Sequence, residues 1–355
     1  MLNLGVTCYS YQDEIRLGRM TWEDVLAHAA SIGAHGFEIV PEQFLTDVEY
    51  ELIPADLVAR WKDQVQKYDL VPTNCNLYDD FDVYPNRILT DDERFDRMRH
   101  GIKLAKTLGF RSVRGCADLP PALLERIIKL AEDNGIIISL EVHAPFSLKS
   151  DWMQTWFDMI ERTGTKYAGI HPDGAIFSRA PRVSAVAQAV RRGAKPEIIE
   201  YLTKEGFPNA VARRAKEREI LRFGAYADTK GYDYDAMHEK VLEMGGGPAE
   251  ERLFSRLACD DPAWLLECKK YIVHFHGKFY DMVDDGQGGF YDPSIDYEGI
   301  VKALVEIGYT GYISSEYEGM GAYHDFDCPT DAPSAADMIT KQHTMIRSYE
   351  AKYAK

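Results

Sequence analysis

Short apolar runs alternate with longer amphipathic stretches along the whole chain. The apolar blocks, such as IIISLEV and YAGI, predict buried β-strands, and the stretches with a repeat of about 3.6 residues predict helices. Gly33, Gly109 and Gly135 follow predicted helices at the position where a helix commonly ends. The eight predicted strands are Asn3–Tyr9, Gly36–Val40, Val71–Leu77, Arg111–Gly115, Ile136–His143, Tyr167–Asp173, Tyr271–Lys278 and Tyr312–Glu318.

A strict alternation of strands and helices predicts a parallel sheet, because each helix carries the chain back to the start of the next strand. Eight such units are the number that closes a barrel, so the fold class predicted is α/β, a (β/α)8 TIM barrel. The 355 residues suit one such domain, 1–355, with insertions.

One stretch breaks the alternation, a long insertion between strands 6 and 7 at residues 175–261. It is too long for one helix and two short loops, and it contains a basic helical piece, AVARRAKEREILR. Loops that follow barrel strands lie on the active-site face, so we expect a lid or a partner-docking segment. A passive decoration is the alternative.

Composition limits the partners of the chain. A formal net charge of −16 argues against nucleic acid as the main partner, because an acidic surface repels phosphate. No apolar run reaches the roughly 18 residues that span a bilayer, and the start resembles a strand more than a signal peptide. Six cysteines without a CxxC pair favour reduced thiols, so a cytoplasmic location with no membrane association is expected.

Four of the predicted strands end in metal-ligand residues. Alternate residues of a strand face the same side, so each of these strands presents a pair of side chains together. Carboxylates and imidazoles delivered from one end of a barrel predict a single divalent-metal site. A lone glutamate at a strand end is usually a solvated loop residue. Four successive strands that all end in carboxylates or imidazoles are hard to explain as solvated loop residues. The pairs are Glu141 and His143, His171 and Asp173, His274 and His276, and Glu316 and Glu318.

One residue of each pair is the preferred ligand. His276 is chosen over His274 because it lies nearer the rim, and Glu316 over Glu318 because the chain should already be leaving the strand there. An oxygen-rich set with one imidazole suits Mn²⁺, with Mg²⁺, Co²⁺ or Zn²⁺ as alternatives. The predicted ligands are Glu141, Asp173, His276 and Glu316.

Two further residues are candidates for catalysis. His143 lies beside the predicted metal, and an imidazole can exchange a proton near neutral pH, so it is the candidate general acid/base. Lys278 could stabilise developing oxyanion charge. A structural histidine and a surface lysine are the simpler alternatives. The candidate substrate-binding residues are His171, which could instead orient Asp173, His274, Glu318, Arg114, Glu38 and Tyr9.

The order Glu, Asp, His, Glu on the last four strands resembles the xylose-isomerase-like barrel family. In that family these positions hold the metal, which implies the same for Glu141, Asp173, His276 and Glu316. The segment HPD departs from the pattern, because His171 precedes the aspartate, where the family has a histidine after it. Within the family, EVH, HFHGKFYDM and GYISSEYEG resemble the larger (alpha) subunit of bacterial C-glycoside deglycosidases.

This resemblance implies a divalent-metal-dependent lyase that acts on 3-oxo-glycosides. The ketone at C3 acidifies the proton on C2, His143 would move that proton, and the bond between C1 and the aryl group would break by elimination. It also implies a small-molecule sugar or glycoside substrate, a small β-rich partner subunit and an oligomeric state.

Three alternatives remain open. A sugar isomerase or ketose 3-epimerase would also begin by removing a proton next to a carbonyl. An AP endonuclease would need histidines from the early strands and a basic groove, which the chain lacks. A catalytically inert sugar-binding or assembly subunit would need no metal, so metal analysis would identify it.

Overall fold

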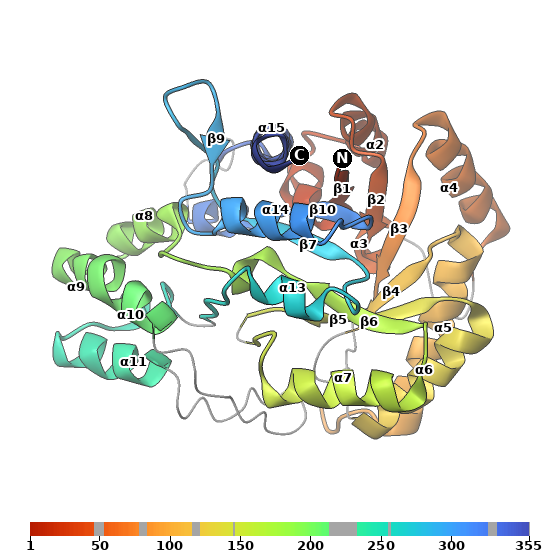
Figure 1. Ribbon diagram of the computed structural model, residues 1–355. Helices are drawn as coiled ribbons and strands as arrows, with labels where there is room; N and C mark the ends of the chain where they lie inside the picture. Colours follow the sequence, from red (N-terminus) through yellow and green to blue (C-terminus); the bar gives the residue numbers. More distant parts are fainter. Residues whose placement is uncertain are drawn as a thin grey trace.

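A parallel barrel forms the centre of the molecule in the computed structural model (Figure 1). The structure describes residues 1–45, 53–77, 84–115, 121–144, 146–212, 233–254, 257–325 and 332–354. The strands are β1 (Asn3–Thr7), β2 (Gly36–Ile39), β3 (Val71–Asn76), β4 (Ser112–Gly115), β5 (Ile137–Val142), β6 (Ala168–Pro172), β7 (Phe275–Phe279) and β10 (Tyr312–Tyr317).

These eight strands pair in the order β6-β5-β4-β3-β2-β1-β10-β7. The chain before β7 completes the ring, because Ile170 N–H donates to the Tyr271 carbonyl at 2.7 Å and Val273 N–H donates to the Ile170 carbonyl at 3.0 Å. The predicted (β/α)8 barrel is confirmed. The seventh strand begins later than predicted, at Phe275, because the preceding residues pair with β6 only through single bridges.

Helices surround the barrel and are fixed by their ends. Thr21 and Thr90 each form a capping box with the residue three positions later, Asp24 and Glu93. In each box, the two side chains accept hydrogen bonds from each other's backbone N–H groups. Gly109 ends its helix at a φ of 87°, a conformation that favours glycine. The outer helices are α2 (Trp22–Ser31), α4 (Ala55–Lys67), α5 (Asp91–Leu108), α6 (Pro121–Asn134), α7 (Asp151–Thr163), α13 (Trp264–Cys268), α14 (Tyr297–Glu306) and α15 (Ala335–Tyr353).

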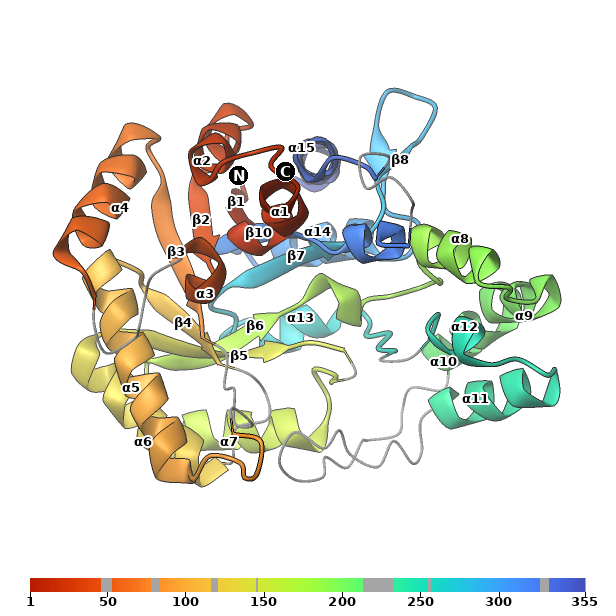
Figure 2. The same ribbon diagram turned by 180° about the vertical axis from the view of Figure 1, so that it is seen from behind.

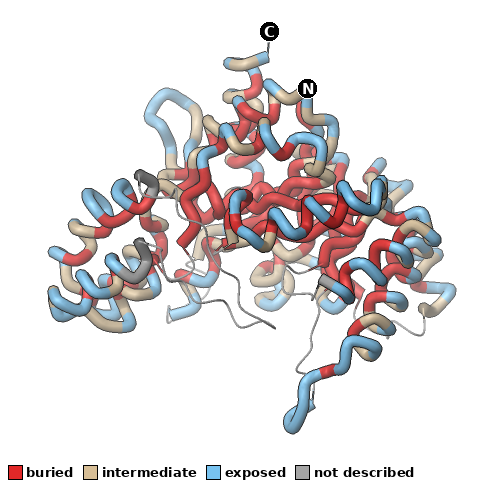
Figure 3. The backbone as a smooth tube through the Cα atoms, turned by 60° about the horizontal axis from the view of Figure 1, so that its bottom comes forward, coloured by how far each residue is buried: buried red, intermediate tan, exposed pale blue. Residues whose placement is uncertain are grey.

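Burial follows this arrangement closely. The barrel strands are buried along nearly their whole length, whereas the helices present one buried and one exposed face (Figure 3). Parallel strands covered on both faces are apolar in continuous runs, which explains the compact apolar blocks of the sequence. No helix among the described residues has the length and apolar character to cross a membrane.

The insertion forms a separate layer of helices. Seen from behind in Figure 2, its helices lie on the side of the barrel opposite α4 and α5. They bury a small apolar cluster of their own, which includes Ile198, Leu202, Phe207 and Met237. Most of the basic stretch AVARRAKEREILR lies outside the described residues. The elements are η2 (Gly174–Ile176), α8 (Val183–Arg191), α9 (Pro196–Tyr201), η3 (Leu202–Gly206), α10 (Phe207–Ala212), α11 (Asp233–Glu243) and α12 (Pro248–Glu251).

Among the described residues outside the insertion, six short elements were not predicted. Two of them are α3 (Pro41–Phe44), which follows β2, and η4 (Gly319–Tyr323), which follows β10. A 3-10 turn, η1 (Cys8–Tyr11), and the helix α1 (Gln12–Arg16) follow β1, and an antiparallel hairpin of β8 (Val283–Asp284) and β9 (Phe290–Tyr291) follows β7. All lie beyond the carboxyl ends of strands, on the side of the barrel where a (β/α)8 active site forms.

Candidate metal centre

Three carboxylates and one imidazole meet at the carboxyl end of the barrel, and we call them the ligand layer. Glu141 comes from β5, Asp173 from the residue after β6, His276 from β7 and Glu316 from β10. One donor atom of each lies within 4.8 Å of the others, and all four residues are buried. His276 Nδ1 is 2.8 Å from Glu141 Oε1, 3.1 Å from Glu316 Oε2 and 3.9 Å from Asp173 Oδ2.

The donor set fits a divalent cation. Asp173 Oδ2 and Glu316 Oε2 are fully buried and accept no hydrogen bond from the described residues. The ammonium group of Lys278 is the cation nearest to both oxygens, and it cannot balance three buried carboxylates alone, so a divalent cation here would remove a cost of burial. Three carboxylates with one imidazole are a set that hard and borderline divalent ions accept. The buried acidic and histidine groups expected from the sequence can therefore hold a metal.

Lys278 is a fixed cation at the edge of the ligand layer. Its Nζ lies 3.2 Å from Asp173 Oδ2, 3.1 Å from Glu316 Oε2 and 3.0 Å from Glu318 Oε1. Burial by itself would lower the pKa of this ammonium group, but the negative charges of Asp173, Glu316 and Glu318 outweigh burial and raise it well above its usual value. Lys278 therefore offsets part of the negative charge gathered there.

The carboxylates of the ligand layer have different environments. Burial would raise the pKa of Glu141, but the charge of Arg114, whose Nη1 is 2.5 Å from Glu141 Oε2, and that of His276 hold it well below the usual value. His276 and Lys278 similarly outweigh burial and lower the pKa of Glu316 to about 2. Arg114 thus occupies one oxygen of Glu141 and leaves Oε1 directed at His276.

Asp173 is the exception in the ligand layer. Burial raises its pKa to about 6, against the opposing charge of Lys278. Its second oxygen, Oδ1, accepts a hydrogen bond from the Ala175 N–H at 2.7 Å. This bond turns Oδ2 toward Lys278 and the other ligands, so the start of η2 fixes the orientation of the aspartate.

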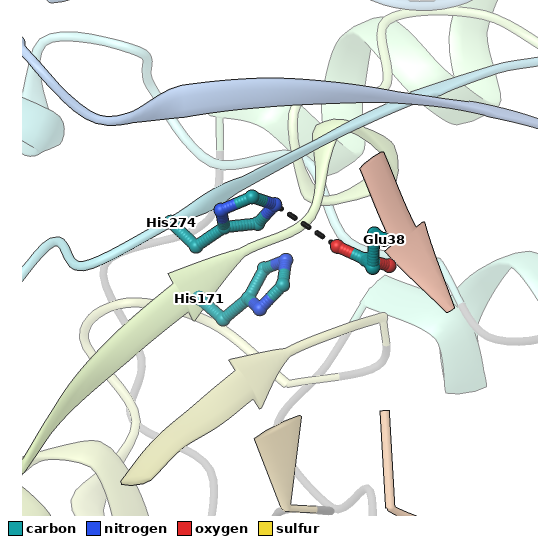
Figure 4. Close-up of side chains that lie close together, drawn as sticks. All are labelled: Glu38, His171 and His274. Atoms are coloured by element: carbon teal, nitrogen blue, oxygen red, sulfur yellow. Dashed lines mark ion pairs between the residues drawn. The ribbon is translucent and has the colours of Figure 1, made fainter. Parts of the chain in front are cut away.

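A second group of metal-type residues lies one layer deeper, and we call Glu38, His171 and His274 the support layer (Figure 4). His276 Nε2 lies 2.7 Å from Glu38 Oε1. A carboxylate can only accept, so Nε2 carries a proton, and Nδ1, which faces Glu141 Oε1 at 2.8 Å, carries one as well; a bound metal would take the place of the proton on Nδ1. A carboxylate that orients a metal-binding histidine from behind is a common arrangement. Glu38 therefore sets the ring orientation of His276.

Two asparagines that sequence reasoning missed hold Glu38 in place. Asn76 Nδ2 donates to Glu38 Oε1 at 2.5 Å, and Asn74 Nδ2 donates to Asn76 Oδ1 at 2.7 Å. Ser112 Oγ then donates to Asn74 Oδ1 at 2.8 Å. The signal was present in β3, VPTNCN, where polar residues at alternate positions face the barrel interior.

The two remaining histidines of the support layer differ in their contacts. His274 Nε2 is 2.9 Å from Glu38 Oε2 and 2.8 Å from Ser314 Oγ. His171 is fully buried, and neither ring nitrogen makes a hydrogen bond with the described residues. Its ring packs against His276 at 3.9 Å between centroids. Burial, together with the positive charges that His276 and His274 can carry, holds the pKa of His171 well below its usual value.

His143 stands apart from both layers and faces a cavity. Its Nδ1 donates to the Ala144 carbonyl at 2.6 Å, since a carbonyl can only accept. The proton is thereby fixed on Nδ1, and Nε2 keeps a lone pair for proton transfer. The residue that follows Ala144, Pro145, lies outside the described residues.

The cavity at His143 has a volume of about 200 Å³, and we call it the His143 cavity. Tyr280 and Glu318 line it from the barrel. The insertion supplies most of the remaining wall. The lining residues that the insertion contributes are Ala175, Ser178, Ala180, Arg182, Phe207, Arg252, Leu253, Phe254 and Leu257.

The structure brings most predicted site residues together and leaves two at the margin. The ligand layer, Arg114, Lys278, Glu318 and the support layer form one connected group. Tyr9, in η1, is partly buried, and burial together with the charges of Glu318 and Glu316 raises the pKa of its hydroxyl. Tyr9 and His143 therefore lie beside the cluster and outside its network of ion pairs.

Comparison with known proteins agrees with this picture. The model of the xylose isomerase-like TIM barrel family matches residues 26–342. The chain is 27% identical to the 3'-dehydrocarminate deglycosidase alpha subunit of Microbacterium sp, over 97% of this chain and 94% of that protein. It is 28% identical to a C-glycoside deglycosidase alpha subunit of Arthrobacter globiformis, over 98% of this chain and 92% of that protein.

Solved structures show the same fold. An L-ribulose 3-epimerase superposes with a TM-score of 0.53 at 15% identity, over 99% of this chain and 96% of that one. The IOLI protein, whose structure holds a zinc atom, superposes with a TM-score of 0.52 at 15% identity over 99% of both chains. Together, the deglycosidase relatives and the family match confirm that this chain is an enzyme.

Proposed function

Given that the chain belongs to the xylose isomerase-like TIM barrel family, we propose that it is the catalytic subunit of a divalent-metal-dependent lyase acting on 3-oxo-glycosides. The observation that carries the proposal is His143, which holds its proton on Nδ1 and lines a partly open cavity together with Glu318, the partner of Lys278 at the edge of the ligand layer. The two relatives named as deglycosidases align with 97% and 98% of this chain, so they support the same reaction class.

The ligand layer would supply the electrophile. A divalent cation held by Glu141, Asp173, His276 and Glu316, most simply Mn²⁺, would act as a Lewis acid on a substrate carbonyl. Arg114 and Glu38 keep Glu141 and His276 in their orientations, so the donors are arranged before substrate arrives. Lys278 offsets negative charge that develops on the sugar next to this layer.

His143 would carry the proton. Its Nε2 removes the proton from C2 of the sugar, next to the C3 ketone, and the electron pair of that bond becomes the C1–C2 double bond. The bond between C1 and the aglycone carbon then breaks, and its electron pair leaves with the aglycone. His143 returns the proton to the aglycone carbon. The products are a 1,2-unsaturated 3-keto sugar and the protonated aglycone, so atoms and electrons balance.

A sugar isomerase or 3-epimerase is the second candidate, and one observation favours it. Glu318 lines the same cavity as His143, so two titratable side chains border the space where the substrate would lie. An epimerase needs such a pair, one on each face of the reacting carbon. Against this role, Glu318 lies 3.0 Å from Lys278 Nζ and is neutralised by it.

The relatives are named alpha subunits, which supports a partner subunit for this chain as well. We propose that the partner is small and β-rich and that the insertion serves as lid or docking segment, since its residues form most of the cavity wall.

A substrate panel separates the candidates. The protein, isolated with any subunit it retains, is incubated with Mn²⁺ and either 3-oxo-C-glycosides of aromatic aglycones or free ketoses. We expect free aglycone from the glycosides, detected by chromatography. Interconversion of ketoses without aglycone release would replace the lyase with the epimerase, and no reaction with any added divalent ion would overturn both.

A further inference from the structure

A second cavity beside the site is lined by arginines, and we call it the arginine cavity. Its volume is about 500 Å³, and Arg182, Arg192 and Arg252 contribute to its wall. Glu318 is its acidic residue among the described ones, and Lys278 neutralises it at 3.0 Å. The chain as a whole carries a net charge of −16, so this positive cavity is opposite in sign to the protein around it.

The three arginines are held in different ways. The Arg182 guanidinium stacks over the ring of Tyr280 at 4.5 Å from the centroid, which holds it at the cavity. Arg192 pairs with Asp325 at 3.6 Å. Arg252, just after α12, is exposed, and its side chain makes no hydrogen bond or ion pair within the described part of the chain. The planar fork of Arg252 is therefore available to a ligand.

The arginine cavity joins the His143 cavity, because Arg182, Arg252 and Glu318 line both. The His143 cavity also has apolar and aromatic lining residues, although polar groups form most of its exposed surface. The apolar side chains are Phe207, Leu253, Phe254 and Leu257.

A molecule that spans both cavities with its reacting sugar at His143 would contact these apolar side chains and reach the guanidinium groups of the arginine cavity. An arginine fork recognises carboxylate and phosphate by two parallel hydrogen bonds. The far end of the substrate should therefore carry an oxyanion.

We propose that the arginine cavity binds an oxyanion, a carboxylate or a phosphate, carried by the aromatic aglycone of the substrate. That the anion is part of an aglycone rests on the proposed function. That an anion binds at all rests on the arginines of the cavity. Arg252 is the main contact of the anion, and Arg182 holds the anion next to the apolar side chains.

The binding test uses free aromatic probes and requires no turnover. The affinities of 2-naphthoate, 2-naphthyl phosphate and the neutral 2-naphthamide are measured by calorimetry for the wild-type protein and for Arg252→Ala, Arg252→Lys and Arg60→Ala. Arg60 is exposed on α4, on the far side of the barrel from α8, and is the matched control. The comparison of naphthoate with naphthyl phosphate identifies which oxyanion the cavity prefers.

We expect the anionic probe to bind about tenfold more tightly than the amide, and Arg252→Ala to remove that difference. Arg252→Lys should keep only part of it, because lysine lacks the fork, and Arg60→Ala should keep all of it. Equal affinity of naphthoate, naphthyl phosphate and naphthamide for the wild-type protein would overturn the proposal, as would an anion preference that survives Arg252→Ala.

Turnover then separates this proposal from the proposed function. Anion binding that depends on Arg252, without aglycone release from any glycoside, would keep the anion site and overturn the lyase. Equal release from acidic and neutral aryl glycosides by wild type and Arg252→Ala would keep the lyase and overturn the anion site.

Discussion

The ligand layer and the support layer have similar residue types and different consequences. Each brings at least three potential metal ligands within 4.8 Å of one another. The ligand layer has three carboxylates for one imidazole and adjoins the His143 cavity, whereas the support layer has one carboxylate for two imidazoles and is buried beneath it.

The difference lies in what each carboxylate already binds. Glu38 Oε1 in the support layer accepts hydrogen bonds from His276 and Asn76, so it is engaged in orienting the layer above. In the ligand layer, Asp173 Oδ2 and Glu316 Oε2 share one ammonium group, that of Lys278, at 3.2 and 3.1 Å, so three carboxylates remain incompletely neutralised. Proximity of potential ligands is therefore a weaker guide to a metal site than the balance of charge around them.

The largest effect is expected in the ligand layer. Glu141→Gln keeps the shape of the side chain but removes the charge that a divalent ion requires. We expect metal content after dialysis to fall to background and turnover to fall by more than about a hundredfold, beyond the loss typical of residues behind the ligands. Elemental analysis and the aglycone assay measure the two quantities.

The control for this variant is Glu306→Gln, an exposed glutamate on α14, which should leave both quantities unchanged. Stoichiometric metal in Glu141→Gln would show that the ion binds elsewhere, and the contrast between the two layers would then lose its basis.

A separate loss of activity is expected at His143, beside the ligand layer. His143→Ala removes the proposed base without touching a ligand, so metal content should be unchanged while turnover falls by about 10²- to 10⁴-fold. The exchange of the substrate C2 hydrogen with deuterated solvent, followed by NMR, should slow by a similar factor. Rapid exchange in the variant would remove His143 as the base.

A smaller effect is expected in the support layer. Glu38→Gln should leave a functional metal site but weaken it, because the amide orients His276 less strongly than the carboxylate. We expect metal affinity to fall about 10- to 100-fold, with activity recovered at high metal concentration. Titration with Mn²⁺ measures the dissociation constant.

The matched control is Glu14→Gln, another buried glutamate, which accepts a hydrogen bond from the Ala335 N–H at 2.7 Å outside the two layers. It should lower stability without changing metal affinity. A Glu38 variant with wild-type affinity would show that the support layer does not orient the ligand.

The sequence predicted the ligand layer because its signal is local. Each of Glu141, Asp173, His276 and Glu316 follows an apolar strand, and a barrel gathers all such strand ends at one rim. The eight strands were found for the same reason, since a buried parallel strand is apolar along its length.

The support layer depends on contacts that no local pattern shows. Glu38 and His276 are 238 positions apart in the chain, and their hydrogen bond depends on barrel closure. The sequence placed Glu38 only as a substrate-binding candidate and passed over Asn74 and Asn76. Lys278 was expected near the site, but its three carboxylate partners follow from the pairing of β7 with β10 and the position of Asp173.

The smallest predicted effect concerns His171, the support-layer residue without a hydrogen-bond partner. Its pKa in the folded protein lies below the usual value of about 6.5, so the unfolded chain takes up the proton first as pH falls. The stability that this neutral histidine contributes is therefore complete above about pH 6.5 and is lost below it, with a slope of about 1.4 kcal/mol per pH unit.

His171→Leu should reduce this acid sensitivity. Leucine fills a similar volume and cannot take up a proton, so the unfolding midpoint of the chelator-treated protein should fall less steeply between pH 6.5 and 5. Near pH 8 the leucine variant should be at least as stable as the wild type, because an unpartnered buried polar group costs about 1–3 kcal/mol of lost hydration. His35→Gln, at an exposed histidine, should follow the wild-type curve. Identical slopes for His171→Leu and the wild type would mean that the pKa of His171 is the same in the folded and the unfolded chain, and that burial does not hold it neutral.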